Sequence, residues 1–390
     1  MSSSTLRHPP PGRVGPPRER SKLRRVDWVL AVAVGCLLVL GTLLVWSATR
    51  QRLAADGLDP QGFLKRHAFN VAVGLVLAAV TAVFDYRMLR AYAPIVYVAS
   101  CAGLVAVLLV GSTINGAHSW IVLGGGFQVQ PSEFAKVGLI VSMAMLLGEK
   151  RDAETVPRGS DVLLVLALAA VPLALVMLQP DFGTAVVLVF VILGVLAVSG
   201  ASSRWILGLL AAGALVTFLA LHVGVLKQYQ LDRFRAFTHP TADTQGVGYT
   251  TRQARIAIGT GGLTGKGLFK GSQTNGQFVP EQHTDFIFTV AGEELGLLGA
   301  GGLILLLGIV LTRGLTIAAR APDLFGRLVA TGVVAWLAFQ SFVNIGMTLG
   351  IMPVTGLPLP FVSYGGSAMF ANLMAVGLLQ NVHLRNTEPA

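Results

Sequence analysis

The sequence predicts an all-α polytopic membrane protein with ten transmembrane helices and a large extracytoplasmic loop between the seventh and the eighth helix. Hydrophobic residues make up 53% of the chain and charged residues only 12%, about half the charged share of an ordinary soluble domain. The mean hydropathy of +0.68 also favours a lipid-embedded chain. Ten apolar runs, each near the length of roughly 20 residues that crosses a bilayer, would use about half of the chain. These values exclude a plain soluble globule and a largely disordered chain.

The predicted helices follow the apolar runs in chain order. They cover residues 27–49, 68–84, 91–110, 133–148, 161–178, 182–199, 204–224, 285–311, 326–350 and 363–383. Because their number is even, both termini are expected on the same side of the membrane. The two cysteines, Cys36 and Cys101, lie inside these runs and fit neither a disulfide framework nor a metal motif.

The distribution of Lys and Arg predicts the orientation. Residues 1–25 are basic and rich in Pro and Ser, and we interpret them as a disordered cytoplasmic tail. With the tail included, the predicted inner segments hold 17 Lys and Arg, against four in the first outer loop and none in the loops 111–132, 179–181 and 351–362. The seven in segment 225–284 count little, because the rule is weak for long loops. Since positively charged loops stay inside, residues 26–385 are predicted as the transmembrane domain, with the end at 386–390 also cytoplasmic. Topology thereby explains the net charge of +10, without a nucleic acid partner.

The predicted extracytoplasmic loop, residues 225–284, is too long for a simple connector. It is basic, with Arg and Lys far outnumbering acids: Arg233, Arg235, Arg252, Arg255, Lys266 and Lys270. A basic surface on the outer face suggests contact with anionic headgroups or a diphosphate. Charge alone equally fits a solvated loop with helices lying on the membrane surface.

Two similar motifs open helices from the outer side. In QPSEFAK, residues 130–136, Glu133 and Lys136 are three residues apart and share one helix face. The alternative is a first-turn acid beside a lysine that reaches the headgroups. In QPDFGT, residues 179–184, Asp181 is placed either to cap its helix or to join that pair. The second option predicts that Lys136 lies between two carboxylates.

A third polar motif, HTDFIF at 283–288, places Asp285 where the long loop meets the eighth predicted helix. If that helix begins at Asp285, Glu293 and Glu294 lie about two turns deeper, roughly 12 Å. Asp285 could simply cap the helix. Three carboxylates near one helix start nevertheless indicate more than capping.

A fourth polar stretch, GIMPVTGLPLPFVSYGGS at 350–367, has no charged residue but many Gly and Pro. Backbone N–H and C=O groups without hydrogen-bond partners are not tolerated in lipid. This segment is therefore expected to line a protein-walled or water-filled cavity, or to lie at the membrane interface. An ordinary outer loop is the alternative.

Motifs of other enzyme classes are missing from the sequence. Residues 259–267 look like a phosphate loop, but Thr260 and Gly267 replace the Gly and the Ser or Thr that it needs. No HExxH, CxxC or GxSxG motif occurs. ATP-driven work, metalloprotease chemistry and α/β-hydrolase chemistry are therefore unsupported, and no nucleotide cofactor is expected.

The motifs together resemble one known family. GLPLPFVSYGGS at 356–367 resembles the signature of the shape, elongation, division and sporulation (SEDS) proteins. QPSEFAK, QPDFGTA at 179–185 and VPEQHTDFIFTVAGEELG at 279–296 are similar to its other motifs, in the same order. The resemblance covers about residues 25–385. GKGLFKGSQ at 265–273 resembles the elongation branch, RodA, more than the division branch, FtsW, or the sporulation branch, SpoVE.

The resemblance implies a peptidoglycan glycosyltransferase of the bacterial plasma (inner) membrane. Such an enzyme polymerises lipid II, working with a class B penicillin-binding protein that supplies the transpeptidase, among membrane lipids. The family's essential acid falls on Asp285. The family motifs place the expected substrate-binding residues at Trp120, Glu133, Lys136, Asp181 and Ser367.

The mechanism expected from these residues is a single displacement. Asp285 would act as general base, with its pKa raised by partial desolvation above the ordinary aspartate value of about 3.9. Lys136, Lys266 and Arg255 are expected to meet the departing undecaprenyl diphosphate, and Mg²⁺ or another divalent cation could share that task.

Two other classes of function stay open at this point. One is a lipid II flippase, because the charged motifs within the predicted membrane helices also occur in transporters. The other is a non-catalytic scaffold that activates the penicillin-binding protein.

Overall fold

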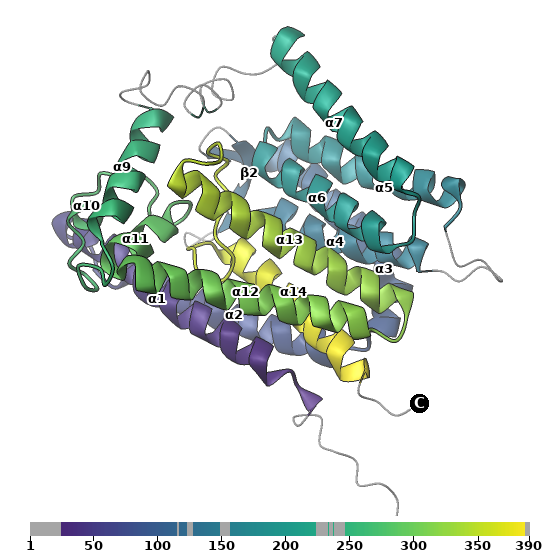
Figure 1. Cartoon of the computed structure of the whole chain (residues 1–390), viewed down its shortest axis with the longest axis horizontal. Coiled ribbons are helices and arrows are strands. Elements are labelled where there is room, and N and C mark those ends of the chain that lie inside the picture. Colours follow the sequence, from purple (N-terminus) through teal and green to yellow (C-terminus); the bar gives the residue numbers. More distant parts are fainter. Residues whose placement is uncertain are drawn as a thin grey trace, which may run out of the picture.

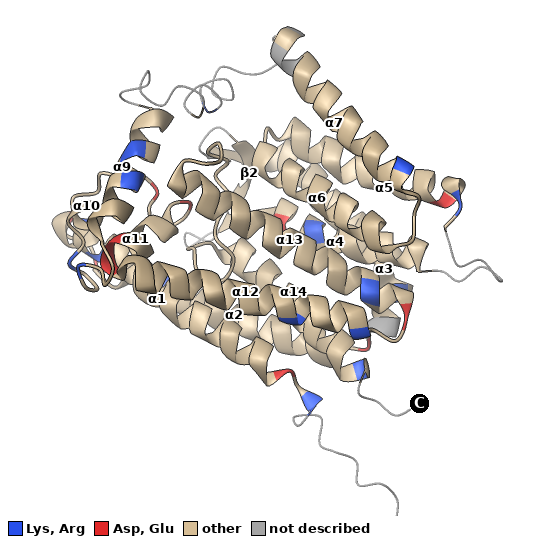
Figure 2. Cartoon of the chain, viewed as in Figure 1, with Lys and Arg blue, Asp and Glu red and all other residues tan. Residues whose placement is uncertain are grey.

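A computed structural model of the chain describes residues 25–114, 117–122, 128–148, 157–223, 233, 237 and 246–386. Helices dominate this part of the chain, and the long ones form a bundle (Figure 1). Charged residues gather toward the two ends of the bundle, and few lie between them (Figure 2). The predicted tail lies outside the described residues, apart from Arg25.

Apart from α12, the long helices match the predicted apolar ranges to within several residues. They are α1 (Trp28–Ala55), α2 (Gly62–Val83), α3 (Tyr86–Val110), α4 (Pro131–Leu147), α5 (Gly159–Leu178), α6 (Phe182–Val198), α7 (Ser203–Val223), α12 (Gly296–Arg320), α13 (Leu324–Leu349) and α14 (Gly366–Asn386). The shorter helices α9 (Val247–Thr260), α10 (Ser272–Asn275) and α11 (Ile287–Glu294) lie together at one end of the bundle (Figure 1).

Six helices in the described ranges are long and apolar enough to cross a membrane: α1, α2, residues 88–110 of α3, α5, α12 and α13. Two more, α6 and residues 203–219 of α7, are apolar but shorter. The helices α4 and α14 carry more polar side chains, and most of their residues are buried in the protein. These features confirm a mostly helical membrane protein.

The predicted helix 285–311 is wrong as a single helix. The chain forms α11, breaks at Gly296 with φ +66°, and continues as α12 to Arg320. A Cβ at Gly296 would lie 2.2 Å from the backbone nitrogen of Gly265, so only glycine fits this turn. Glu293 and Glu294 consequently pack against the loop that follows α9, where their carbonyl groups accept from the amides of Lys266 and Gly267. Along the chain they follow Asp285 by about two turns of α11.

A small sheet occupies the loop before α4, where the sequence predicted no strand. Strands β1 (Ser112–Ile114), β2 (Ala117–Val122) and β3 (Gln128–Val129) pair antiparallel in the order β1-β2-β3. The backbone N–H of His118 in β2 donates to the carbonyl of Gln179, at 3.1 Å. The sheet is thereby tied to the turn between α5 and α6.

The helices α4 and α13 form the interior of the bundle. α13 packs against α4, α6, α12 and α14, while α1 packs against α2 and α12. Asp27 caps α1 and forms a 2.7 Å ion pair with Arg313 of α12. Its backbone also exchanges two hydrogen bonds with the Gln380 amide of α14. The N-terminal end of α1 and the C-terminal end of α14 therefore lie at the same end of the bundle.

Residues 350–365 connect α13 to α14 and are called the linker below. Leu357, Leu359, Phe361 and Val362 of the linker are at most 3% exposed. The amides of Gln340 and Asn344 on α13 donate to the linker carbonyls of Pro358 and Leu357 at 2.8 and 2.7 Å. The expectation of protein-walled backbone is confirmed, and the ordinary outer loop is excluded.

Candidate active site

Asp285 lies directly before α11, and both α13 and the linker hold it in place. The Asn344 amide donates to the Asp285 backbone carbonyl at 2.8 Å and to the Leu357 carbonyl at 2.7 Å. One side-chain amide thus joins the two segments. The Oδ2 atom of Asp285 faces Gly356 of the linker, since a Cβ built there would lie 3.4 Å from it.

Gly356 has φ +77°, a backbone conformation that costs other residues about 1–2 kcal/mol. We expect Gly356→Ala to lower stability by about that amount and to reduce turnover, because the new methyl group would crowd the carboxylate of Asp285. Thermal unfolding and kcat/KM measure the two effects. Gly208→Ala on α7 is the control, since a Cβ there meets nothing within 4 Å. Equal effects of the two changes would contradict the prediction.

The surroundings of Asp285 disfavour its charged form, although its side chain is partly exposed. Loss of hydration raises the pKa of Asp285 to about 7, and repulsion from Glu281 adds to this rise. The positive charge of Arg233 acts in the opposite direction. Such a carboxylate is a far better proton acceptor near neutral pH than a solvated one.

The raised pKa predicts a pH dependence. Well below pH 7 the rate should fall about tenfold per pH unit, because only ionised Asp285 accepts a proton. The folded pKa exceeds the unfolded value, so Asp285 also makes the fold less stable as pH rises from about 4 to 7. A pH–rate profile of wild type and Glu281→Gln checks this. Removing the Glu281 charge should move the rising limb to lower pH, and an unmoved limb would count against the assignment.

Two arginines line a small cavity beside the linker. Arg233 and Arg255 enclose it together with Thr251, Gly350 and Pro353. The guanidinium of Arg233 donates to the Thr355 carbonyl at 3.1 Å. Arg255 lies on α9, next to Gly350 at the end of α13. Guanidinium groups are well suited to phosphate oxygens, so this cavity can stabilise a departing diphosphate.

Glu133 and Lys136 form a buried ion pair at the start of α4. The Nζ–Oε1 distance is 2.8 Å, and both side chains are at most 2% exposed. Lys136 also donates to the Oε1 atom of Gln340 at 3.0 Å and lies over the Trp336 ring. Lys136 is therefore not a surface lysine reaching the headgroups. The prediction that it lies between two carboxylates is wrong, because its second partner is an amide.

Asp181 interacts with the segment before α4 instead. It caps α6 by accepting from the backbone of Thr184 at 3.1 Å, as one alternative predicted. Its other oxygen accepts from the amide of Gln130 at 3.0 Å. The Gln130 backbone N–H donates to the hydroxyl of Ser367 at 2.9 Å, which brings Asp181 and Ser367 together. Trp120 lies in the neighbouring β2, opposite Ser112.

The sequence matches the family model of the cell cycle proteins FtsW, RodA and SpoVE over residues 27–388. The chain belongs to the FtsW/RodA/SpoVE family. This is the family that the sequence motifs predicted.

Known relatives agree with this assignment. The peptidoglycan glycosyltransferase MrdB of Escherichia coli (strain K12) is 38% identical over 363 residues, which cover 92% of this chain and 93% of MrdB. A chain of a solved peptidoglycan synthase complex has a TM-score of 0.78 and 34% identity, covering 93% of this chain and 99% of that chain. RodA of Thermus thermophilus has a TM-score of 0.68 and 34% identity, covering 93% and 98%. The predicted class of enzyme, a glycosyltransferase, is thereby confirmed.

In this FtsW/RodA/SpoVE chain, Lys266 belongs to a polar cluster between α9 and α11. Its ammonium group donates to Glu293 at 2.8 Å and to the hydroxyls of Thr260 and Ser272. Burial alone would raise the pKa of Glu293, but hydrogen bonds from Lys266 and from backbone amides lower it. These contacts favour a structural role for Lys266, and its predicted contact with a diphosphate stays a prediction.

A metal centre made only of protein ligands is not found in the described ranges, where no three His, Cys, Asp or Glu side chains cluster.

Three residues of α13 were missed from the sequence. Trp336, Gln340 and Asn344 lie four residues apart on one face of the helix and are buried. Gln340 contacts Lys136 and Pro358, and Asn344 contacts Leu357 and Asp285. This face of α13 thereby connects the Glu133–Lys136 ion pair with Asp285, because Gln340 and Asn344 contact the neighbouring linker residues Pro358 and Leu357. The regular spacing of polar side chains on an apolar helix was the available signal.

Proposed function

We propose that this chain polymerises lipid II into glycan strands during cell elongation, with Asp285 as general base. The observation that carries the proposal is the position of Asp285. Its carboxylate has a pKa near 7, lies against the linker, and is close enough to Arg233 to feel its charge. The guanidinium groups of Arg233 and Arg255 line one small cavity next to the linker.

In the proposed reaction, Asp285 accepts the proton of an acceptor sugar hydroxyl. The oxygen attacks the anomeric carbon of the donor, and the bond to undecaprenyl diphosphate breaks. Direct attack by an activated hydroxyl predicts inversion at that carbon. The arginines offset the charge that develops on the leaving group. A divalent cation such as Mg²⁺, bound to the diphosphate, would have the same effect.

The proposed roles of the other residues follow their contacts. The Glu133–Lys136 pair holds the linker through Gln340 and so shapes the substrate site. Trp120, Asp181 and Ser367 lie where the small sheet meets the starts of α6 and α14. Their proposed role is to form one wall of the substrate site.

The proposed topology has ten membrane spans in the bacterial plasma membrane. Both termini are cytoplasmic and the end with α9–α11 is outside. The distribution of Lys and Arg supports this orientation. The hydrogen bonds between Asp27 and Gln380 support placing both termini on one side.

The proposed partner is a class B penicillin-binding protein that crosslinks the strands. Similarity to a chain of a peptidoglycan synthase complex supports such a partner. Similarity to MrdB and to the rod shape determining protein RodA supports a role in elongation.

Purified protein in lipid vesicles with lipid II tests the function, with and without the partner. We expect glycan polymer whose yield depends on this chain even when the partner is present. Transbilayer movement of labelled lipid II without polymer would instead identify a flippase. Polymer made by the partner alone, unchanged when this chain is omitted, would identify a scaffold.

A further inference from the structure

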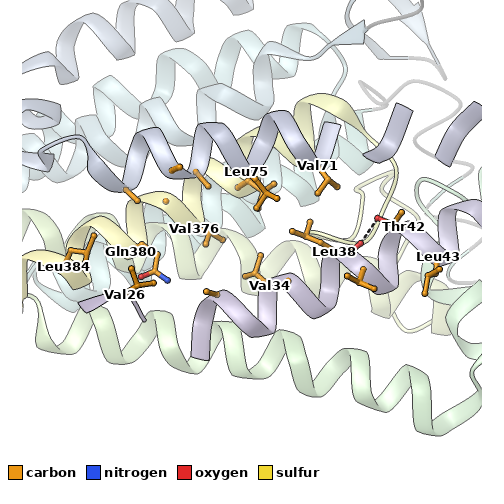
Figure 3. A pocket seen from close by; sticks show the side chains of 18 residues that line it. Val26, Val34, Leu38, Thr42, Leu43, Val71, Leu75, Val376, Gln380 and Leu384 are labelled. Atoms are coloured by element: carbon orange, nitrogen blue, oxygen red, sulfur yellow. Dashed lines mark hydrogen bonds between the residues drawn. The ribbon is translucent and has the colours of Figure 1, made fainter. Parts of the chain in front are cut away.

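An open apolar groove lies between α1, α2 and α14, and none of the candidate active-site residues lines it. Its volume is about 580 Å³. Figure 3 shows Val34 and Leu38 of α1 facing Leu75 of α2 and Val376 of α14 across it. Leu75 is 49% exposed, so the groove is accessible from the lipid that surrounds the bundle.

The polar side chains in the lining already have partners within the protein. The hydroxyl of Thr42 donates to the backbone carbonyl of Leu38 at 2.7 Å (Figure 3). The side-chain amide of Gln380 exchanges two hydrogen bonds with the backbone of Asp27. The other lining residues are aliphatic or glycine. The groove therefore requires no polar group from an occupant and suits a hydrocarbon chain.

The length of the groove restricts its occupant. Its helical lining covers residues 31–43 of α1, 71–82 of α2 and 373–384 of α14, each roughly 16–18 Å long. On all three helices it extends from the middle of the bundle to the end at which Asp27 and Gln380 lie. One leaflet has a hydrocarbon depth of about 15 Å, half of the core thickness. The groove thus matches one phospholipid acyl chain, whereas a spanning helix of a partner needs about twice this length.

Cationic side chains lie at that end of the groove. Arg25 directly precedes Val26 of the lining and is half-buried. Arg385 directly follows Leu384 of the lining and pairs with Asp85 at 3.6 Å. In the part of the chain that the structure describes, Arg25 takes part in no ion pair. A negatively charged headgroup above the groove would meet Arg25 first.

The sequence before α1 adds to this positive charge. The segment RERSKLRR at 18–25 contains five Lys and Arg and one acid. Four to eight basic residues immediately cytoplasmic of a membrane helix are typical of proteins that bind anionic lipids. The charge of this segment and the apolar groove beside Val26 together favour an amphiphile with an anionic headgroup.

We propose that the groove between α1, α2 and α14 binds one acyl chain of an anionic phospholipid, with the headgroup beside Arg25. The proposal goes beyond the proposed function and takes from it only the orientation, which makes the lipid one of the cytoplasmic leaflet. An acyl chain gains little by leaving other lipid tails for an apolar groove. Selection among lipids therefore depends chiefly on the charge of the headgroup.

Competition between two lipids tests the role of charge. The purified protein in detergent receives equimolar dioleoyl phosphatidylglycerol and dioleoyl phosphatidylcholine, which share their acyl chains, and native mass spectrometry counts the bound lipid. The wild type should retain phosphatidylglycerol preferentially. Arg25→Gln should weaken its binding about fivefold and leave phosphatidylcholine unchanged. The matched control is Arg204→Gln, at an exposed arginine that starts α7 on the same predicted side and away from the groove.

Filling the groove tests the position of the acyl chain. Gly35 lines the groove, and a Cβ there meets nothing within 4 Å, so Gly35→Phe should occupy it without a clash. Ala79→Phe on α2 fills it from the opposite wall. Both variants should lose the retained phosphatidylglycerol. The control is Gly208→Phe on α7, where a Cβ also meets nothing within 4 Å. Added phosphatidylglycerol should raise the unfolding temperature of the wild type and this control, but not of the filled variants.

Three results would overturn the proposal: phosphatidylglycerol retained by the filled variants as by the wild type, phosphatidylcholine retained as strongly as phosphatidylglycerol, or equal effects of Arg25→Gln and Arg204→Gln. Replacement of the bound phosphatidylglycerol by equimolar undecaprenyl phosphate would assign the groove to a longer chain and would also overturn it. None of these measurements needs catalysis. A protein that retains phosphatidylglycerol as expected but makes no polymer would therefore contradict the proposed function alone.

Discussion

Replacing Asp285 by Asn should reduce polymerisation of lipid II by about 100- to 10,000-fold, the usual contribution of a positioned general base. The change removes the proton acceptor but keeps the shape of the side chain. The hydrogen bond from Asn344 goes to the backbone carbonyl of residue 285, so the loop should keep its position. The measurement is the initial rate of glycan formation by purified protein.

The control for this change is Asp59→Asn, at an exposed carboxylate of the α1–α2 turn that pairs with Lys65. It should leave the rate within about twofold of wild type, because exposed ion pairs contribute little. The Asp285→Asn variant should unfold at the wild-type temperature or slightly above it at pH 8, since the ionised carboxylate disfavours the fold. A well-folded variant with wild-type polymer yield would remove Asp285 from the base role.

Replacing Lys136 by Met should have the largest effect on stability, a loss of about 3–5 kcal/mol. The change leaves the Glu133 carboxylate without its cation in the interior, where the charge is costly. It also removes the hydrogen bond to Gln340, which supports the linker at Pro358. The unfolding temperature in detergent measures the loss.

The double variant Glu133→Gln/Lys136→Met separates stability from catalysis. Without a buried charge, it should recover most of the lost stability. Its polymerisation rate should stay low, because the contact between position 136 and Gln340 is still missing. A double variant no more stable than Lys136→Met would show that the uncompensated charge is not the cause.

The apolar spans could be predicted because their length and hydropathy are local properties of the sequence. The break between α11 and α12 could not be predicted, because apolar residues occur on both sides of Gly296. The turn depends on the contact of Gly296 with Gly265 and Leu263, which are distant in the chain. The short strands before α4 were missed for a similar reason. Their pairing is set by contacts between β1, β2 and β3 rather than by any long alternating pattern.

Individual charged residues of the site could be selected from motifs, but their partners could not. Lys136 was expected to meet Asp181, which lies at a similar helix start, yet Gln340 comes from a helix more than 200 positions away in the chain. Arg233 lies in a basic loop where nothing local distinguishes it from Arg235 or Arg252. Contact with the linker, which lies far away in the chain, places Arg233 near the carboxylate of Asp285.

The side-chain amide of Asn344 couples two backbone segments to α13. It donates hydrogen bonds to the carbonyls of both Asp285 and Leu357, so a movement of α13 would carry both segments with it. Arg255 belongs to another helix, α9. In the proposed mechanism, a sliding movement of α13 against α9 would therefore change the distance between Asp285 and Arg255 without altering the hydrogen bonds that Asn344 donates to Asp285 and Leu357.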